Sequence, residues 1–260
     1  MQHATTTQHR HRLIAAIDET ERNIDRDSWY LMCAVTVDLE SGTRLTMMRD
    51  LQSVSQRQPT SDRLHRHAIH ANQMWLTEPG QRDLFEVEAI IAADPSLRLD
   101  VTVRQITARQ AFEQTRQICV AHLVTHLHTD VKGVTFDTRD YLETKTRKPK
   151  PGVDITTHRE LVNHYDLATI DQLKTDGRVK ADLDIVWAND FGNPHLWIPD
   201  VVAYACGQTL ASGNPQRLVR LASRLHVSEA VTRPDSVEPA PSTGIANVLE
   251  ALRQQALPLR

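Results

Sequence analysis

Hydrophobic and polar residues alternate along this chain in segments that are typical of strands and helices. The first apolar run, LIAAI, begins at Leu13 and ends at two adjacent carboxylates, Asp18 and Glu19. A continuous run of this length predicts a strand that is buried on both faces of a sheet. The β-branched and aromatic residues 28–38 predict a second strand. Because only the charged turn 21–27 separates them, we expect an antiparallel hairpin.

The rest of the chain alternates between helical spacing and strand patterns. Apolar residues at helical spacing predict helices over residues 43–58, 81–95, 108–128, 157–174 and 196–213. Strand patterns cover residues 97–106, 131–137 and 183–190, with a shorter one over 63–70. Helices placed between strands imply crossover connections and parallel strands. The prediction is an α/β fold whose mixed central sheet starts with an antiparallel hairpin, continues with parallel strands and is flanked by helices.

The pattern divides the chain into four parts. Residues 1–12 are polar, lack the apolar core of a signal peptide and are expected to be flexible. Residues 13–225 form one domain, and residues 226–242 are a proline-bearing linker. Residues 243–260 predict an amphipathic helix, which either packs on the domain or engages a protein partner.

Composition narrows the class of protein. Of 260 residues 40% are hydrophobic, and no apolar run is long enough to span a bilayer, so we expect a cytoplasmic protein without membrane contact. The three cysteines are far apart in apolar stretches, which favours buried thiols in a reducing compartment. The net charge of -3 gives no overall attraction to nucleic acid, but a local basic surface remains compatible with it.

Acidic residues stand where several predicted strands end. Asp137 and Asp190 close two later strands, as Asp18 and Glu19 close the first, and Asp200 lies in a helix rich in apolar residues. Because the carboxyl ends of parallel strands meet at one edge of a sheet, these acids are expected to converge. The alternative is ordinary: an Asp at a strand boundary, or one that caps a helix and is hydrogen-bonded there.

Oxygen ligands without Cys or His favour Mg²⁺ or Mn²⁺ over Zn²⁺. Two such ions stabilise both the attacking water and the leaving oxygen in phosphodiester hydrolysis. The chain contains no nucleophile elbow, phosphate-binding loop or dinucleotide fingerprint that would indicate another chemistry.

Four short motifs carry a resemblance to a known family: IAAIDET, YLMCAVTVD, VTFDTRD and LWIPDVVAYA. Together they resemble the ribonuclease H-like proteins grouped as domain-of-unknown-function family 3800, over residues 13 to about 210. The resemblance implies a mixed sheet flanked by helices and a metal-dependent nuclease-type site. Many proteins of this fold act on RNA, RNA–DNA hybrids or DNA, and others use the scaffold for different work.

The resemblance assigns roles to individual residues. Asp18 and Glu19 match the family's first-strand acids, and Asp200 matches the acid of its late helix. Asp137 stands where an acid, often Glu, is expected. Asp171 corresponds to a further polar residue. Two positions depart from the pattern: Thr20 replaces a common serine, and Pro199 replaces the usual alanine.

Groups of histidines and a basic segment suggest two further hypotheses, a zinc site and a phosphate-binding loop. The chain has 13 histidines, including the groups His65, His67 and His70, and His122, His126 and His128. The spacing of His122 and His126 suits zinc, but the glutamate of a metalloprotease helix is missing, so a surface position is favoured. One of His65 and His67 is a candidate neighbour of the acids.

The most basic stretch contains Lys145, Arg147, Lys148 and Lys150. It is either a solvated loop or a set of contacts to substrate phosphates.

The sequence therefore predicts a divalent-metal-dependent nuclease that hydrolyses RNA, hybrid or DNA. Asp18, Asp137 and Asp200 are the expected ligands of Mg²⁺ or Mn²⁺, and Glu19 is an additional ligand or a base. The alternative is a non-catalytic interaction module of a defence or mobile-element system on the same scaffold.

Overall fold

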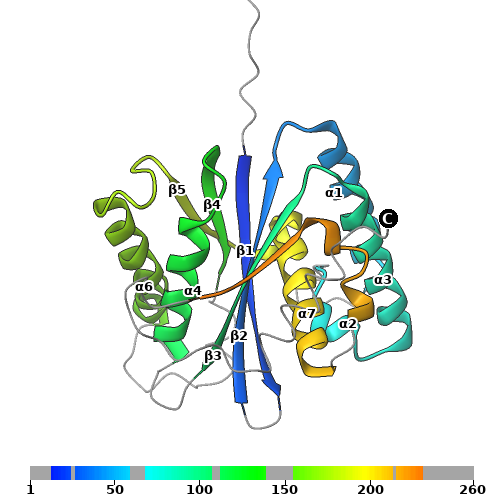
Figure 1. The fold of residues 1–260 in the computed structure, drawn as a ribbon. Helices are drawn as coiled ribbons and strands as arrows, with labels where there is room; N and C mark the ends of the chain where they lie inside the picture. The colour runs from blue at the N-terminus through cyan, green and yellow to red at the C-terminus, as the bar shows by residue number, and fades with distance from the viewer. Residues whose placement is uncertain are drawn as a thin grey trace, which may run out of the picture.

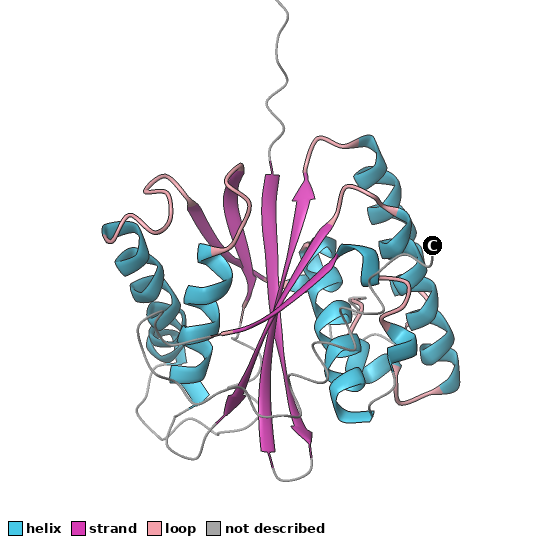
Figure 2. Cartoon of the chain, in the orientation of Figure 1, coloured by secondary structure: helices cyan, strands magenta, loops and turns pink. Residues whose placement is uncertain are grey.

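Six strands form one mixed sheet with helices on both faces (Figures 1 and 2). The computed structural model describes residues 13–24, 27–58, 68–106, 112–138, 155–212 and 215–230. The strand order across the sheet is β5-β4-β1-β2-β3-β6. The predicted α/β class, with a mixed sheet between helices, is confirmed. The predicted segments 1–12 and 243–260 lie outside the described residues.

The hairpin β1 (Leu13–Ile24) and β2 (Asp27–Asp38) forms the centre of the sheet. Its antiparallel register runs from Leu13 opposite Asp38 to Ile24 opposite Asp27. The turn predicted over residues 21–27 is therefore wrong for most of its length, because the strand continues through the charged residues. Glu21 and Asn23 are exposed, so strand pairing leaves these polar side chains in solvent.

The other strands extend the sheet on both sides of the hairpin. β3 (Arg98–Ile106) pairs antiparallel with β2, whereas β4 (Val131–Asp137) pairs parallel with β1 and β5 (Asp184–Ala188) parallel with β4. β6 (Leu225–Glu229) pairs parallel with β3. β6 was not predicted, and most of it falls in the segment 226–242 that was expected to be a linker. A five-residue edge strand gives only a weak alternating signal.

Helices cover the two faces unequally. One face carries α4 (Phe112–Thr125) and α6 (Ile155–Thr175). The other carries α1 (Gly42–Ser55), α2 (Ala71–Met74), α3 (Glu78–Ala93) and α7 (Trp197–Ser212). The five predicted helices are present. Within the predicted strand 63–70, residues 63–67 lie outside the described part and residues 68–70 are not in a strand.

The hydrophobic core has two halves, one on each face of the sheet. Ile14 and Cys33 belong to the half under α7, whereas Ala15, Ile17 and Met32 belong to the half under α4 and α6. This division follows from the two-residue repeat of a strand, which points successive side chains to opposite faces. Asp18 and Glu19, which lie in the middle of β1, therefore face different halves of the molecule. The prediction that the strand ends at these two acids is wrong, because pairing with β2 continues to Ile24.

The α2–α3 corner is fixed by a glycine and a cap. Thr77 precedes α3, and its Oγ1 accepts a hydrogen bond from the N–H of Gly80 at 3.1 Å. A Cβ atom at Gly80 would lie 2.2 Å from the carbonyl oxygen of Met74, so no other residue fits this close approach. The corner holds the start of α2, whose first N–H contributes to the site described below.

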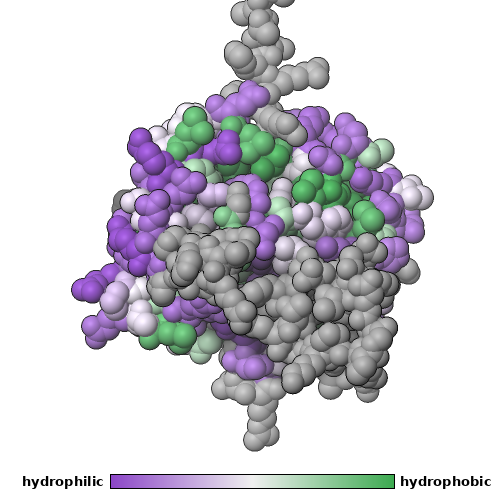
Figure 3. All heavy atoms as spheres, turned by 180° about the vertical axis from the view of Figure 1, so that it is seen from behind, coloured by the Kyte–Doolittle hydropathy of each residue, from purple (hydrophilic) through white to green (hydrophobic). Residues whose placement is uncertain are grey.

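Two expectations from the sequence concern the cysteines and helices that could span a membrane. The three cysteines are free and buried. No helix in the described ranges is long and apolar enough to cross a membrane. Seen from behind, hydrophobic side chains gather in two patches in the upper part of the molecule, surrounded by hydrophilic ones (Figure 3).

Candidate metal centre

Three neighbouring parallel strands bring acids to one edge of the sheet. Ile17 of β1 pairs with Phe136 of β4. Asp18 and Asp137 are the next residues on these two parallel strands. Asp137 pairs in turn with Ala188, and Asp190 comes two residues later, at the start of the short helix η1 (Asp190–Gly192). Phe136 lies in the core half under α4 and α6, so Asp137 points to the α7 side, as Asp18 does.

The fourth acid, Asp200, comes from the first turn of α7. Its Oδ2 accepts a hydrogen bond from the backbone N–H of Ala71 at 2.8 Å, which anchors the carboxylate to the start of α2. Asp18, Asp137, Asp190 and Asp200 are all half-buried. We call these four residues the acidic cluster.

The pKa values show that the acidic cluster is one electrostatic unit. Burial raises the pKa of Asp18 well above its usual range, and the charges of Asp200, Asp137 and Glu19 raise it further. Burial, with repulsion from Asp190, Glu19 and Asp200, raises the pKa of Asp137 to about 8. Asp18 and Asp200 therefore repel each other, although Asp200 comes from a helix and not from a strand end.

Among the described residues, His70 and Arg22 bring positive charge towards the acidic cluster. His70 Nε2 lies 3.5 Å from Asp190 Oδ2, and this contact lowers the pKa of Asp190 against the larger, raising effect of burial. Burial likewise raises the pKa of Asp200, while the Ala71 N–H, His70 and Arg22 lower it. In the sequence, His70 stands out only as one member of a group with His65 and His67. His65 and His67 lie outside the described residues.

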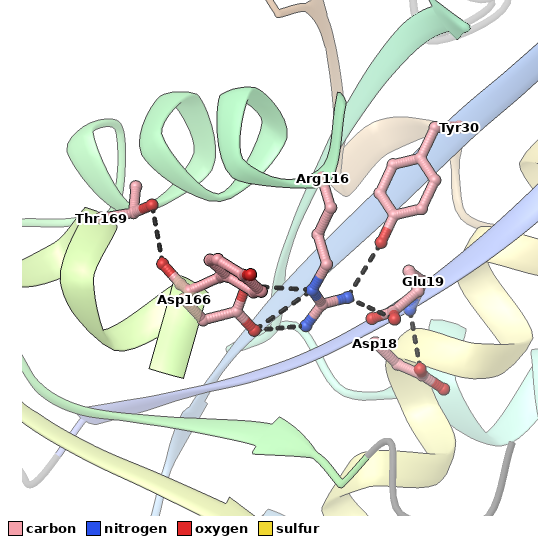
Figure 4. A network of polar contacts seen from close by, with 7 residues as sticks. Asp18, Glu19, Tyr30, Arg116, Asp166 and Thr169 are labelled. Atoms are coloured by element: carbon pink, nitrogen blue, oxygen red, sulfur yellow. Dashed lines mark hydrogen bonds and ion pairs between the residues drawn. The ribbon is translucent and has the colours of Figure 1, made fainter. Parts of the chain in front are cut away.

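Glu19 points to the opposite face and joins a different set of side chains (Figure 4). It forms an ion pair with Arg116 of α4, whose guanidinium is fully buried. Arg116 also binds the buried Asp166 of α6 with Nε and Nη2, at 2.7–3.1 Å, and donates to the hydroxyl of Tyr30 at 2.9 Å. We call Glu19, Tyr30, Arg116 and Asp166 the Arg116 network. The predicted role of Glu19 as a ligand or base stays a prediction.

The Arg116 network was missed because its members are ordinary polar residues in helices and strands. A signal was present: Arg116 shares a helical stripe with Cys119, Val120 and Leu123, all buried. A charged residue on such a stripe requires a buried partner. Burial opposes the charge of Arg116, but its acidic and phenolic partners raise its pKa well above the usual value.

Other predicted residues lie away from the acidic cluster. Asp171 is exposed on α6, which covers the opposite face of the sheet. The rings of His122 and His126 stack 4.3 Å apart, and His122 Nε2 lies 3.0 Å from the hydroxyl of Ser228. The basic run Lys145, Arg147, Lys148 and Lys150 lies outside the described residues.

The donor atoms of the acidic cluster suit a hard divalent cation. They are carboxylate oxygens whose raised pKa values reflect repulsion that a cation would relieve. Within the described residues, however, no three His, Cys, Asp or Glu side chains are already arranged so that they could hold a metal ion. The chemistry of the donor atoms therefore fits Mg²⁺ or Mn²⁺, whereas their arrangement among the described residues is not that of a complete metal site.

In comparisons with known proteins, no family model, no curated protein and no solved structure matched this chain. The resemblance given by the four short motifs thus stays a prediction.

Proposed function

We propose that this protein is a Mg²⁺- or Mn²⁺-dependent nuclease of ribonuclease H-like fold. Asp18, Asp137 and Asp200 are the proposed ligands. The observation that supports the proposal is the gathering of acids from the middle of β1, the end of β4 and the first turn of α7, where burial and mutual repulsion raise their pKa values. An antiparallel hairpin at the start of the sheet and parallel strands after it support the fold.

The chain's own residues supply the geometry for hydrolysis. When bound, divalent ions provide an activated water and stabilise the leaving oxygen of a phosphodiester. Asp18 and Asp137 hold fixed positions because they extend a rigid central sheet. The N–H of Ala71 orients Asp200. Hydrolysis by this route requires no nucleophilic side chain of the protein.

The test is cleavage of labelled RNA, RNA–DNA hybrid and DNA in Mg²⁺, Mn²⁺ or EDTA. We expect wild type to cut at least one substrate only with metal, and Asp18→Asn, Asp137→Asn and Asp200→Asn to lose roughly a hundredfold or more in rate. Asp171→Asn, on the opposite side, is the matched control and keeps full activity. If all variants behave like wild type, the nuclease proposal is wrong.

A second candidate is the non-catalytic interaction module. It is favoured by the lack, among the described residues, of three side chains ready to hold a metal. Thermal unfolding with added Mn²⁺ separates the two. A ligand specific to the folded state stabilises it by about 2.7 kcal/mol at a hundred times its dissociation constant. An unchanged melting temperature at millimolar Mn²⁺ favours the module.

Partners remain proposals in either case. Nucleic acid is the proposed substrate, with the run Lys145, Arg147, Lys148 and Lys150 as its phosphate contacts. Neutralising these residues is expected to weaken binding of all sequences alike and to flatten its salt dependence. A protein partner for residues 243–260 is the corresponding proposal for the module.

A further inference from the structure

A pocket of about 290 Å³ lies on the same face of the sheet as the acidic cluster. Its volume is near the lower end of the range of roughly 300–1,000 Å³ that small-molecule sites occupy. Its floor is formed by β4 and β5, including Thr135, Val186 and Ala188. Arg44, Leu39 and His195 are among the residues that close its other sides. We call it the β4–β5 pocket.

The β4–β5 pocket adjoins the acidic cluster and extends away from it. Ala188 lines the pocket and pairs with Asp137, so one end lies beside the acids. Gly133 lines the other end and lies on β4, four residues before Asp137. At ~3.3 Å per residue, Gly133 and Asp137 are separated by roughly 13 Å. A polynucleotide with one phosphate at the acids would place a neighbouring nucleotide here.

The polar groups of the pocket suit a phosphate at its far end. Arg44 Nη1 donates to the carbonyl oxygen of Leu39 at 2.5 Å, which fixes the guanidinium. Its Nε is buried and has no hydrogen-bond partner. The edge formed by Nε and Nη2 is the one that pairs with two phosphate oxygens. Asp184 also lines the pocket and pairs with Gly133 at this same end, but it is exposed, so solvent screens its repulsion of a phosphate.

The remaining lining suits a nucleobase. Burial and the neighbouring Arg44 lower the pKa of His195 to about 4, so its ring is neutral at pH 7 and offers one donor and one acceptor. Asn193 donates with Nδ2 to the carbonyl of Asn189 at 2.7 Å, which leaves its carbonyl oxygen for a ligand. Val186 lies on the edge strand β5 and is 44% exposed. It offers an apolar surface for one side of a base.

We propose that the β4–β5 pocket binds the base and phosphate of an unpaired nucleotide that flanks the bond cut at the acidic cluster. A base enclosed in this pocket cannot be paired with a second strand, so the substrate is single-stranded or locally unpaired. This inference rests on the nuclease proposal for its biological meaning. Nucleotide binding itself does not depend on that proposal.

The direct test is titration of the full chain with 5′-UMP and 5′-AMP in EDTA, followed by calorimetry or NMR. We expect saturable binding by wild type and a weakening of at least about tenfold in Val186→Trp, which fills the pocket. Val219→Trp places the same side chain at another exposed valine and should leave binding unchanged. Arg44→Met should weaken binding of 5′-UMP more than of uridine. Circular dichroism checks that each variant is folded.

The outcomes distinguish this inference from the nuclease proposal. If wild type shows no saturable nucleotide binding, or if Val186→Trp binds as tightly as Val219→Trp, the pocket is not a nucleotide site, whatever the protein cleaves. If nucleotides bind as expected but no metal-dependent cleavage occurs, the pocket stands and the nuclease proposal fails. If cleavage occurs, single-stranded substrate should be preferred, and Val186→Trp should reduce that preference. Equal cleavage of paired and unpaired substrate overturns the inference.

Discussion

The two faces of the sheet at the middle of β1 differ in how they accommodate negative charge. On one face Glu19 meets a buried arginine that also binds Asp166 and Tyr30, so every carboxylate has a cationic partner. On the other face Asp18 meets Asp137 and Asp200, and burial together with their repulsion raises the pKa of Asp18. Adjacent residues on one strand thus belong to a compensated network and to an uncompensated cluster.

The difference separates stability from function. The Arg116 network satisfies its buried charges internally, and removing one member leaves the others unpaired. The acidic cluster stores unfavourable electrostatic energy that folding alone does not require. Groups whose pKa values are strongly perturbed by burial and by each other are typical of ligand-binding or catalytic sites. The comparison therefore predicts opposite effects of mutation on the two faces.

The largest effect is expected for Arg116→Met. It leaves Glu19 and Asp166 without their cation in the protein interior, and such a loss costs roughly 3–5 kcal/mol of unfolding free energy. Urea unfolding at pH 7 measures it. The control is Arg57→Met, which removes surface pairs with Glu86 and Asp83 and should cost at most about 1 kcal/mol. Similar losses in the two variants would show that the network is not a structural centre.

Glu19→Gln is expected to have the next largest effect. Arg116 loses one charge partner but keeps Asp166, so we expect a loss of roughly 2 kcal/mol in urea unfolding. Mn²⁺ affinity should stay near that of wild type, because Glu19 faces away from the acidic cluster. If Glu19→Gln loses Mn²⁺ as Asp18→Asn does, Glu19 is a ligand, and the two faces act as one site.

Asp137→Asn should stabilise the metal-free protein at high pH. The folded pKa of Asp137 is about 8, above its ordinary value of 3.8, so the folded state binds more protons between these values and wild-type stability falls as pH rises through them. Even one pKa unit corresponds to about 1.4 kcal/mol. In EDTA we expect a gain of at least about 1 kcal/mol at pH 8 that disappears near pH 4. Asp184→Asn, on the exposed edge, is the control. A gain independent of pH would contradict the assignment.

Asp171→Asn should have the smallest effect. Asp171 is exposed on α6, far in the sequence and on the opposite side of the sheet from the acidic cluster. Surface substitutions of this kind usually change stability by less than about 0.5 kcal/mol. Unfolding and Mn²⁺ titration should both match wild type. A loss of metal binding would restore the role that its sequence motif suggested.

The elements that could be predicted from the sequence are those whose hydrophobic pattern is clear within the element itself. The run before Asp18 and the helix around Asp200 were found because their apolar patterns are long and continuous. The short edge strand at Leu225–Glu229 was missed because only its pairing with β3 defines it. Likewise, the charged residue Glu21 suggested a turn, but the ladder with β2 continues past it.

The sequence led us to expect that the acids converge, but not that Asp18 and Glu19 lie on opposite faces of the sheet. Asp137 ends β4, Asp18 lies beside it in the middle of β1, and the first turn of α7 adds Asp200. The alternation of side chains along β1 already implies that Glu19 points away from Asp18. Its partner could not be identified, because Arg116 and Asp166 lie on helices whose contact depends on tertiary packing.

The most direct test of the account is calorimetric titration of the metal-free protein with Mn²⁺. The account predicts saturable binding in wild type and in Glu19→Gln, and its loss in both Asp18→Asn and Asp200→Asn. If wild type binds no Mn²⁺ at millimolar concentration, or if the two Asp variants bind as well as Glu19→Gln, the acidic cluster is not a metal centre.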